Sequence, residues 1–140
     1  LMSINDELAI LREVAPFSML DNKKLKLLAF MSEIVFYEAG TMVLKQGDKG
    51  DAVFILIDGL IDVSISPSSV ASHIREMGRH AFFGEIAVMR NTFRAATVTA
   101  KTDITALKVS KDVLYKMIAD EPELGTLIAD HIEKAGYTIP

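Results

Sequence analysis

The sequence has 140 residues, half of them hydrophobic and 24% charged, which suffices for one folded domain with a core and is too short for two ordinary domains. Its formal net charge of −4, with no clustered basic face, argues against direct nucleic-acid binding. The absence of cysteine excludes disulfides, thiolate metal sites and cysteine nucleophiles, and no apolar stretch approaches the roughly 20 residues that span a bilayer.

Helical spacing dominates the first zone, residues 1–33. Ile4, Leu8 and Leu11 recur at the spacing of one helix face. Asp21 is a suitable N-cap for a second helix, whose apolar residues again fall on one face. The zone is therefore predicted to contain N-terminal helices.

Short β runs separated by glycine fill residues 34–109. The apolar run 53–57 precedes Asp58-Gly59, a dipeptide typical of two-residue hairpins. Residues 61–65 then alternate strictly between apolar and polar side chains. Many short strands with regular turns indicate a sandwich or barrel and not a parallel sheet.

Two further helices are predicted over residues 110–136. Ser110 can cap the first of them, Pro122 suits the first turn of the second, and Gly136 is a suitable C-terminal stop. The second helix carries an apolar stripe that must pack against something.

One segment inside the β zone, residues 82–97, interrupts the strand pattern. Residues 85–89 can form a short helix, and Gly84 before it allows a close approach of the backbone. The N–H groups at a helix N-terminus favour an anion. Arg94 adds a planar fork of donors that fits phosphate oxygens in pairs.

Glu85 does not fit a simple phosphate site, because a carboxylate beside a phosphate repels it. The conflict disappears if Glu85 accepts a hydrogen bond from a ribose hydroxyl. The small residues Ala95 and Ala96 leave room around the anion. A sugar–phosphate ligand therefore satisfies every element of the segment.

This segment resembles the phosphate-binding cassette of the cyclic-nucleotide-binding domain family. The similarity runs through Phe83-Gly84-Glu85-Ile86-Ala87 and Arg94-Ala95-Ala96-Thr97, with the family's spacing between the two halves. It continues through the glycines at Gly40, Gly47-Asp48 and Gly59, and through the helices at both ends of the chain.

The resemblance implies one cyclic-nucleotide-binding domain over residues 1–140, mainly β with flanking helices. Its implied architecture is a double-stranded β-helix, or jelly-roll, barrel with N-terminal helices, a short cassette helix and two C-terminal helices. The barrel would occupy residues 34–109 and include the cassette at 82–97. The helices would occupy residues 1–33 and 110–136.

The resemblance also implies particular roles in the site. Arg94 binds the exocyclic phosphate oxygens, Glu85 binds the ribose 2′-hydroxyl, and the amides of Ile86, Ala87 and Ala96 add donors. The residues expected to bind the ligand are Gly84, Glu85, Ile86, Ala87, Val88, Arg94, Ala95 and Ala96. No catalytic residue, metal site or cofactor is expected.

The expected ligand is cAMP, with cGMP possible. A threonine after the cassette arginine is associated in this family with cGMP, since its hydroxyl can meet the guanine amino group. Here that residue is Ala95, which favours cAMP over cGMP by the free energy of one hydrogen bond, about 0.5–1.5 kcal/mol. Ile128, Ile132 and Tyr137 are open candidates for the residue that caps the base.

We therefore expect a cytoplasmic, non-enzymatic sensor domain that transmits cAMP occupancy through its C-terminal helices. Its partner is an effector domain or another subunit, and a homodimer is possible. One alternative is an interaction domain that kept the barrel and lost its ligand; His80 and Phe93, which depart from the family pattern, are its only support. Another is the sensor part of a catabolite-activator-like transcription regulator, whose DNA-binding part is not in this sequence.

Overall fold

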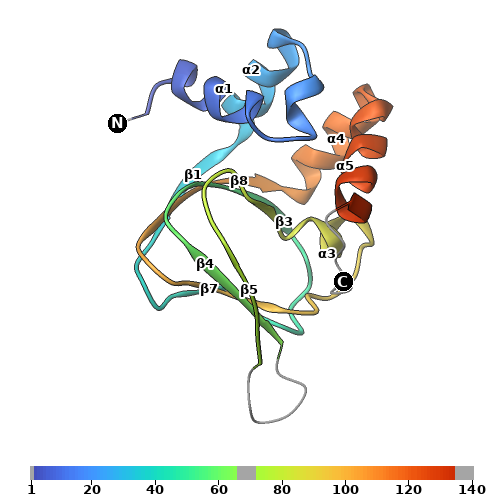
Figure 1. Cartoon of the computed structure of the whole chain (residues 1–140). Coiled ribbons are helices and arrows are strands. Elements are labelled where there is room, and N and C mark those ends of the chain that lie inside the picture. Colours follow the sequence, from blue (N-terminus) through green and yellow to red (C-terminus); the bar gives the residue numbers. More distant parts are fainter. Residues whose placement is uncertain (1, 66–71, 135–140) are drawn as a thin grey trace.

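Two antiparallel four-stranded sheets form a barrel at the centre of the part of the chain that the structure describes, residues 2–65 and 72–134 (Figure 1). In this computed structural model the sheets have strand orders β1-β8-β3-β6 and β2-β7-β4-β5. The strands are β1 (Glu33–Tyr37), β2 (Met42–Leu44), β3 (Ala52–Asp58), β4 (Ile61–Ile65), β5 (Ser72–Met77), β6 (Phe82–Phe83), β7 (Thr97–Ala100) and β8 (Ile104–Ser110). With helices at one end, this arrangement confirms the predicted mainly β barrel.

Two of the helices, α2 and α4, begin at the caps that the sequence predicts. Asp21 accepts a hydrogen bond from the Lys24 N–H, and Ser110 accepts one from the Val113 N–H. Gly136, the predicted stop of the last helix, lies outside the described residues. The helices are α1 (Ile4–Arg12), the short 3-10 helix η1 (Phe17–Met19), α2 (Asn22–Met31), α3 (Glu85–Met89), α4 (Lys111–Asp120) and α5 (Pro122–Lys134).

The hairpin predicted at Asp58-Gly59 is wrong. Strand β3 pairs with β8 and β6, whereas β4 pairs with β5 and β7 in the other sheet. The chain therefore turns a corner between sheets at this point. Gly59 has φ +97°, and a Cβ there would lie 2.4 Å from the Asp103 carbonyl oxygen. The corner requires glycine, so Asp58-Gly59 correctly indicated a turn, although the strands on either side of it do not pair.

Strand β3 separates two hydrophobic cores. Alternating side chains send Val53 and Ile55 toward the helices and Phe54 and Leu56 into the barrel. All four side chains are buried, which explains why this strand reads as an uninterrupted apolar run. A shift of β3 therefore alters the packing of both cores.

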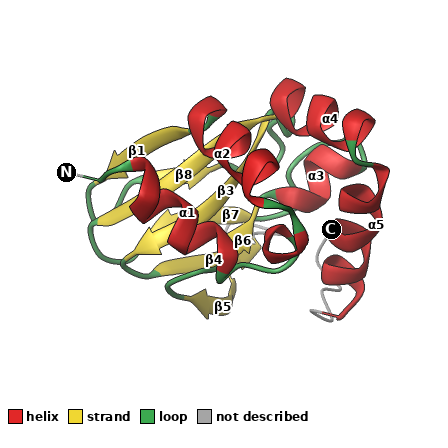
Figure 2. Ribbon diagram, turned by 90° about the horizontal axis from the view of Figure 1, so that it is seen from above, coloured by secondary structure: helices red, strands yellow, loops and turns green. Residues whose placement is uncertain are grey.

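The N-terminal and C-terminal helices pack together over the same end of the barrel, where α2 contacts α4 (Figures 1 and 2). The short helix α3 lies between the barrel and α5. Both helix groups contribute to the core on the outer side of β3, through Leu11, Leu25, Leu114 and Ile128 among others. Within residues 2–65 and 72–134, no helix is long and apolar enough to cross a membrane.

Candidate functional site

Gly84 starts the cassette helix in a conformation that few other residues adopt. It is the N-cap of α3, follows directly after β6, and has φ +81°. A Cβ at this position would lie 3.0 Å from a guanidinium nitrogen of Arg94 and 3.3 Å from Leu44. The left-handed turn and the close approach of Arg94 both favour glycine here.

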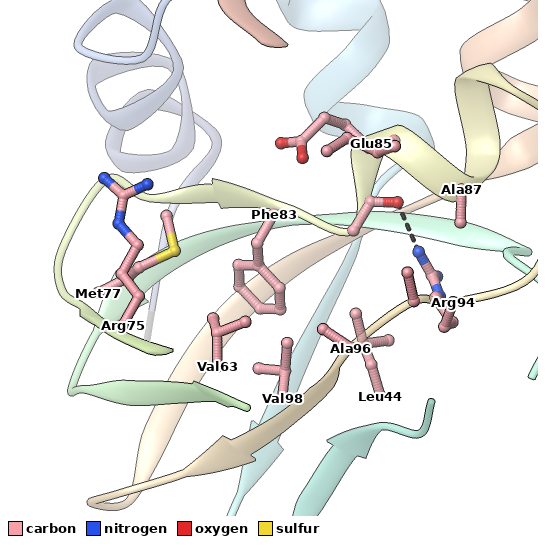
Figure 3. A pocket seen from close by; sticks show the side chains of 13 residues that line it. Leu44, Val63, Arg75, Met77, Phe83, Glu85, Ala87, Arg94, Ala96 and Val98 are labelled. Atoms are coloured by element: carbon pink, nitrogen blue, oxygen red, sulfur yellow. Dashed lines mark hydrogen bonds between the residues drawn. The ribbon is translucent and has the colours of Figure 1, made fainter. Parts of the chain in front are cut away.

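Arg94 is buried and held by main-chain carbonyl groups. It is 5% exposed, and its guanidinium donates to the Gly84 carbonyl oxygen and, at 2.7 Å, to the Ala52 carbonyl oxygen (Figure 3). The exposed Asp51 carboxylate lies 4.0 Å from it. Burial lowers the pKa of Arg94, but a guanidinium keeps its proton at any physiological pH. The site therefore contains a fixed, buried positive charge.

The loop before β3 fixes the position of Arg94 through its backbone. The Arg94 N–H donates to the Asp48 carbonyl oxygen at 2.6 Å, and its carbonyl oxygen accepts from the Gly47 N–H at 2.7 Å. Gly50 in the same loop packs against α3 so closely that a Cβ there would lie 2.7 Å from the Ala87 Cβ. The Gly47–Asp48 turn thus supports the site without contributing a side chain to it.

Glu85, the first residue of α3, is 3% exposed. Burial raises the pKa of its carboxyl to about 7, although hydrogen bonds from the backbone N–H groups of Glu85 and Ile86 and the charges of Arg94 and Arg75 lower it. One carboxyl oxygen, Oε2, is fully buried and has no hydrogen-bond partner among the described residues. A buried acceptor without a donor is unusual in a folded protein and marks a place where a ligand donor fits.

Glu85 and Arg94 line one cavity (Figure 3). The cavity encloses about 540 Å³ of space, part of which is continuous with solvent. A space of this size suits a small molecule such as a nucleotide. Its lining residues are Leu44, Val63, Arg75, Met77, Phe83, Gly84, Glu85, Ile86, Ala87, Arg94, Ala95, Ala96 and Val98.

Seven of the eight predicted ligand-binding residues are in this lining. The eighth, Val88, is fully buried in the core between the barrel and the helices. Of the candidates for the base cap, Ile128 lies in the same core and Ile132 packs against it, whereas Tyr137 lies outside the described residues. Neither Ile128 nor Ile132 belongs to the cavity lining.

The sequence pattern did not reveal which strand residues form the wall of the cavity. Leu44, Val63, Met77, Phe83 and Val98 supply apolar surface from five different strands. Inward alternation marked Val63 as buried, but only the strand register shows which buried residues face the ligand space.

Arg75 is a further cavity residue that the sequence pattern did not reveal. It lies on β5 opposite Val63 of β4, and it reaches the cavity on the side away from Arg94 (Figure 3). The one signal that could have revealed it is a charged residue within an otherwise ordinary strand. The cavity lining therefore combines two arginines, the carboxyl of Glu85 and apolar side chains.

The family model described as cyclic nucleotide-binding domain matches residues 34–121. The chain belongs to the cyclic nucleotide-binding domain family. The resemblance seen in the cassette sequence is thus confirmed.

The sequence of this cyclic nucleotide-binding domain is similar to parts of a cGMP-dependent protein kinase and of a cAMP-dependent protein kinase regulatory subunit. It is 30% identical over 127 residues to the cGMP-dependent protein kinase egl-4 of Caenorhabditis briggsae, covering 89% of this chain and 17% of that protein. It is 30% identical over 110 residues to the cAMP-dependent protein kinase regulatory subunit of Aspergillus niger, covering 79% of this chain and 26% of that protein. The chain spans less than a third of the length of these relatives.

Solved structures of the same fold include a PKA regulatory domain and a catabolite activator protein. The regulatory domain of Toxoplasma gondii PKA with cAMP superposes with a TM-score of 0.79 at 26% identity, over 84% of this chain and 45% of that chain. Thermus thermophilus catabolite activator protein superposes with a TM-score of 0.77 at 19% identity, over 85% of this chain and 56% of that chain. The second likeness concerns the fold alone.

Proposed function

We propose that this domain binds cAMP, in preference to cGMP, in the cavity between α3, Arg94 and the barrel, and acts as a regulatory module without catalytic activity. One observation carries the proposal. Arg94 and Glu85, a buried cation and a buried carboxyl, line the same small cavity on either side of the α3 N-terminus. A cyclic nucleotide offers the matching pair, an anionic phosphate and a ribose hydroxyl donor.

Each part of the nucleotide has a matching surface. The guanidinium of Arg94 has five N–H donors, so its bonds to two carbonyl oxygens leave donors for phosphate. Oε2 of Glu85 needs a donor, which the ribose hydroxyl supplies. Val63, Met77 and Val98 provide an apolar surface for the purine ring.

Calorimetric titration of the protein with cAMP tests the proposal. We expect saturable one-site binding, and at 100 times the dissociation constant the nucleotide should add about 2.7 kcal/mol to the free energy of unfolding. A flat titration together with an unchanged unfolding temperature contradicts it. This result would favour the interaction domain that lost its ligand.

The two residues that supported the lost-ligand alternative do not line the cavity. His80 occupies a left-handed turn between β5 and β6 with φ +70°, and Phe93 is 63% exposed. Neither belongs to the cavity lining. These departures from the family pattern therefore do not obstruct the proposed site.

A second candidate ligand is cGMP, and Arg75 is the observation that favours it. A guanidinium can donate two hydrogen bonds to O6 and N7 of guanine, whereas adenine carries an amino donor in place of O6. Arg75 lines the cavity on the side away from the phosphate-binding arginine, where a base would lie. Parallel titrations with the two nucleotides decide between them.

Replacing Ala95 with threonine is expected to shift the affinity ratio toward cGMP by about 2- to 10-fold, because one added hydrogen bond is worth about 0.5–1.5 kcal/mol. Ala95 is half-buried in the cavity wall, so a hydroxyl there can reach the ligand. The matched control is Ala95→Val, which adds the same volume without a hydroxyl. Equal cAMP/cGMP ratios in the threonine and valine variants would refute the selectivity argument.

We further propose that α4 and α5 transmit occupancy. The Tyr115 hydroxyl of α4 donates to the Val88 carbonyl oxygen of α3 at 2.5 Å, and Lys111 donates to the Asn91 side chain at 2.9 Å. Helix α5 also contacts α3. If the nucleotide pulls α3 inward, these contacts give α4 and α5 a different preferred position, which is a shift between two states of unequal nucleotide affinity.

The change Tyr115→Phe tests this link. It removes one hydrogen bond, worth about 1 kcal/mol, while keeping the ring. We expect the cAMP-induced change in amide exchange over α4 to shrink, with cAMP affinity altered less than about fivefold. Tyr37→Phe on β1, away from α3, is the control and should preserve the response. If cAMP changes amide exchange only within the cassette of the wild type, the domain binds cAMP but does not transmit occupancy to α4 and α5.

A further inference from the structure

The buried oxygen Oε2 of Glu85 faces one side chain of the C-terminal helix. Nε2 of His131, on α5, lies 4.0 Å from Oε2. The imidazole ring packs at 5.4 Å from the Phe82 ring, and the His131 side chain is 26% exposed. A displacement of about 1 Å would close this gap to hydrogen-bond distance.

Both members of the pair are titratable groups. Burial raises the pKa of Glu85 to about 7 and lowers that of His131. A carboxylate 4.0 Å away opposes the second effect, because it favours the charged imidazole. The charged groups that act on the pKa of Glu85 are Arg94, on the loop before β7, and Arg75, on β5. Neither arginine can give up its proton, so a proton in this region belongs to Glu85 or His131.

We propose that His131 is a positioning residue for nucleotide recognition, in which its imidazole and the ribose hydroxyl of the ligand are alternative partners for Oε2 of Glu85. This inference rests on the proposed function. A proton on the pair ties α5 to α3 and occupies the oxygen that the ribose needs. Nucleotide binding then releases that proton to solvent and frees α5 from the cassette.

The sign of the pH dependence follows from this competition. The proton and the nucleotide exclude each other, so nucleotide affinity rises as pH increases through about 7. Above that range the pair holds no proton, and the presence of His131 no longer opposes binding. Its contribution is therefore confined to acidic and neutral pH.

A titration of the histidine side chains by NMR tests the pairing without nucleotide. The protein has three histidines, and the signal that disappears in His131→Gln identifies His131. In Glu85→Gln we expect the His131 pKa to fall by about one unit or more, since the nearby negative charge is removed. An identical His131 titration in the wild type and in Glu85→Gln overturns the proposal.

Calorimetry with cAMP at pH 6.0 and pH 8.5 tests the competition. Glutamine at position 131 cannot be protonated, so His131→Gln should bind cAMP about 3-fold or more tightly than the wild type at pH 6.0, and equally at pH 8.5. The control is His80→Asn, which removes another histidine and suits the left-handed conformation of that turn. It should follow the wild-type pH profile.

The outcomes separate the two proposals. Wild-type protein that binds cAMP at neither pH overturns the proposed function and, with it, this inference. Binding with the same pH profile in the wild type and in His131→Gln overturns only the role of His131. An increase in cAMP affinity at pH 6.0 that occurs in His131→Gln but not in His80→Asn supports the role of His131.

Discussion

Alanine in place of Arg94 is expected to weaken cAMP binding by about 30- to 4000-fold. The change leaves a phosphate charge without its partner in a buried site, which costs about 2–5 kcal/mol. Arg94→Lys keeps the charge but loses the planar fork, so it should recover only part of the affinity. Calorimetry with the wild type and both variants measures the effect. Equal affinities in the wild type and Arg94→Ala would show that Arg94 does not bind the phosphate.

The fold must be checked in the same variants, because Arg94 also bonds two main-chain carbonyl groups. Without the guanidinium, the carbonyl oxygens of Gly84 and Ala52 lose a donor inside the protein. Each unsatisfied buried group costs about 1–3 kcal/mol. Thermal unfolding without nucleotide reports this loss separately, and the affinities are compared at a temperature where every variant is folded.

Glu85→Gln is expected to change stability and nucleotide affinity in opposite directions. The pKa of Glu85 in the fold is about 7, above the usual 4.5, so the unfolded chain loses this proton first as pH rises. Ionisation of Glu85 therefore destabilises the protein progressively from about pH 4.5 to 7, and by an amount on the order of 3 kcal/mol above that range. The glutamine variant should be the more stable protein at pH 8 and lose this advantage near pH 4.5.

Affinity should fall in the same variant, because a hydrogen bond to a charged acceptor is worth about 1.5–3 kcal/mol. We expect Glu85→Gln to bind cAMP about 10- to 150-fold more weakly than the wild type at pH 8. A double-mutant cycle with 2′-deoxy-cAMP assigns this loss to the ribose hydroxyl. If the variant loses as much affinity for 2′-deoxy-cAMP as for cAMP, Glu85 does not bind that hydroxyl.

The cassette could be predicted from sequence because its chemistry is local. Gly84, Glu85 and Arg94 lie within eleven consecutive residues of the chain, and a helix start between them already implies where the N–H groups point. The same holds for the caps at Asp21 and Ser110, each of which acts on the next turn of its own helix.

Features that depend on distant pairing could not be read in this way. The wrong hairpin at Asp58-Gly59 arose because a tight turn and a corner between sheets both need glycine, and only the partners of β3 and β4 distinguish them. Arg75 reaches the cavity through the register of β5 on β4. His131 meets Glu85, 46 positions earlier in the chain, because α5 folds back onto α3.

The position of β3 between two cores limits how the site can be redesigned. Strand β3 contributes no residue to the cavity lining, and a residue exchanged on its barrel side shares its backbone with Val53 and Ile55, so a change there also perturbs the packing of the helices. Along β4 and β7, Val63 and Val98 face the cavity and alternate with half-exposed polar residues on the outside of the barrel. A biosensor engineer who wants a new ligand with the original response should therefore vary β4 and β7 and leave β3 intact.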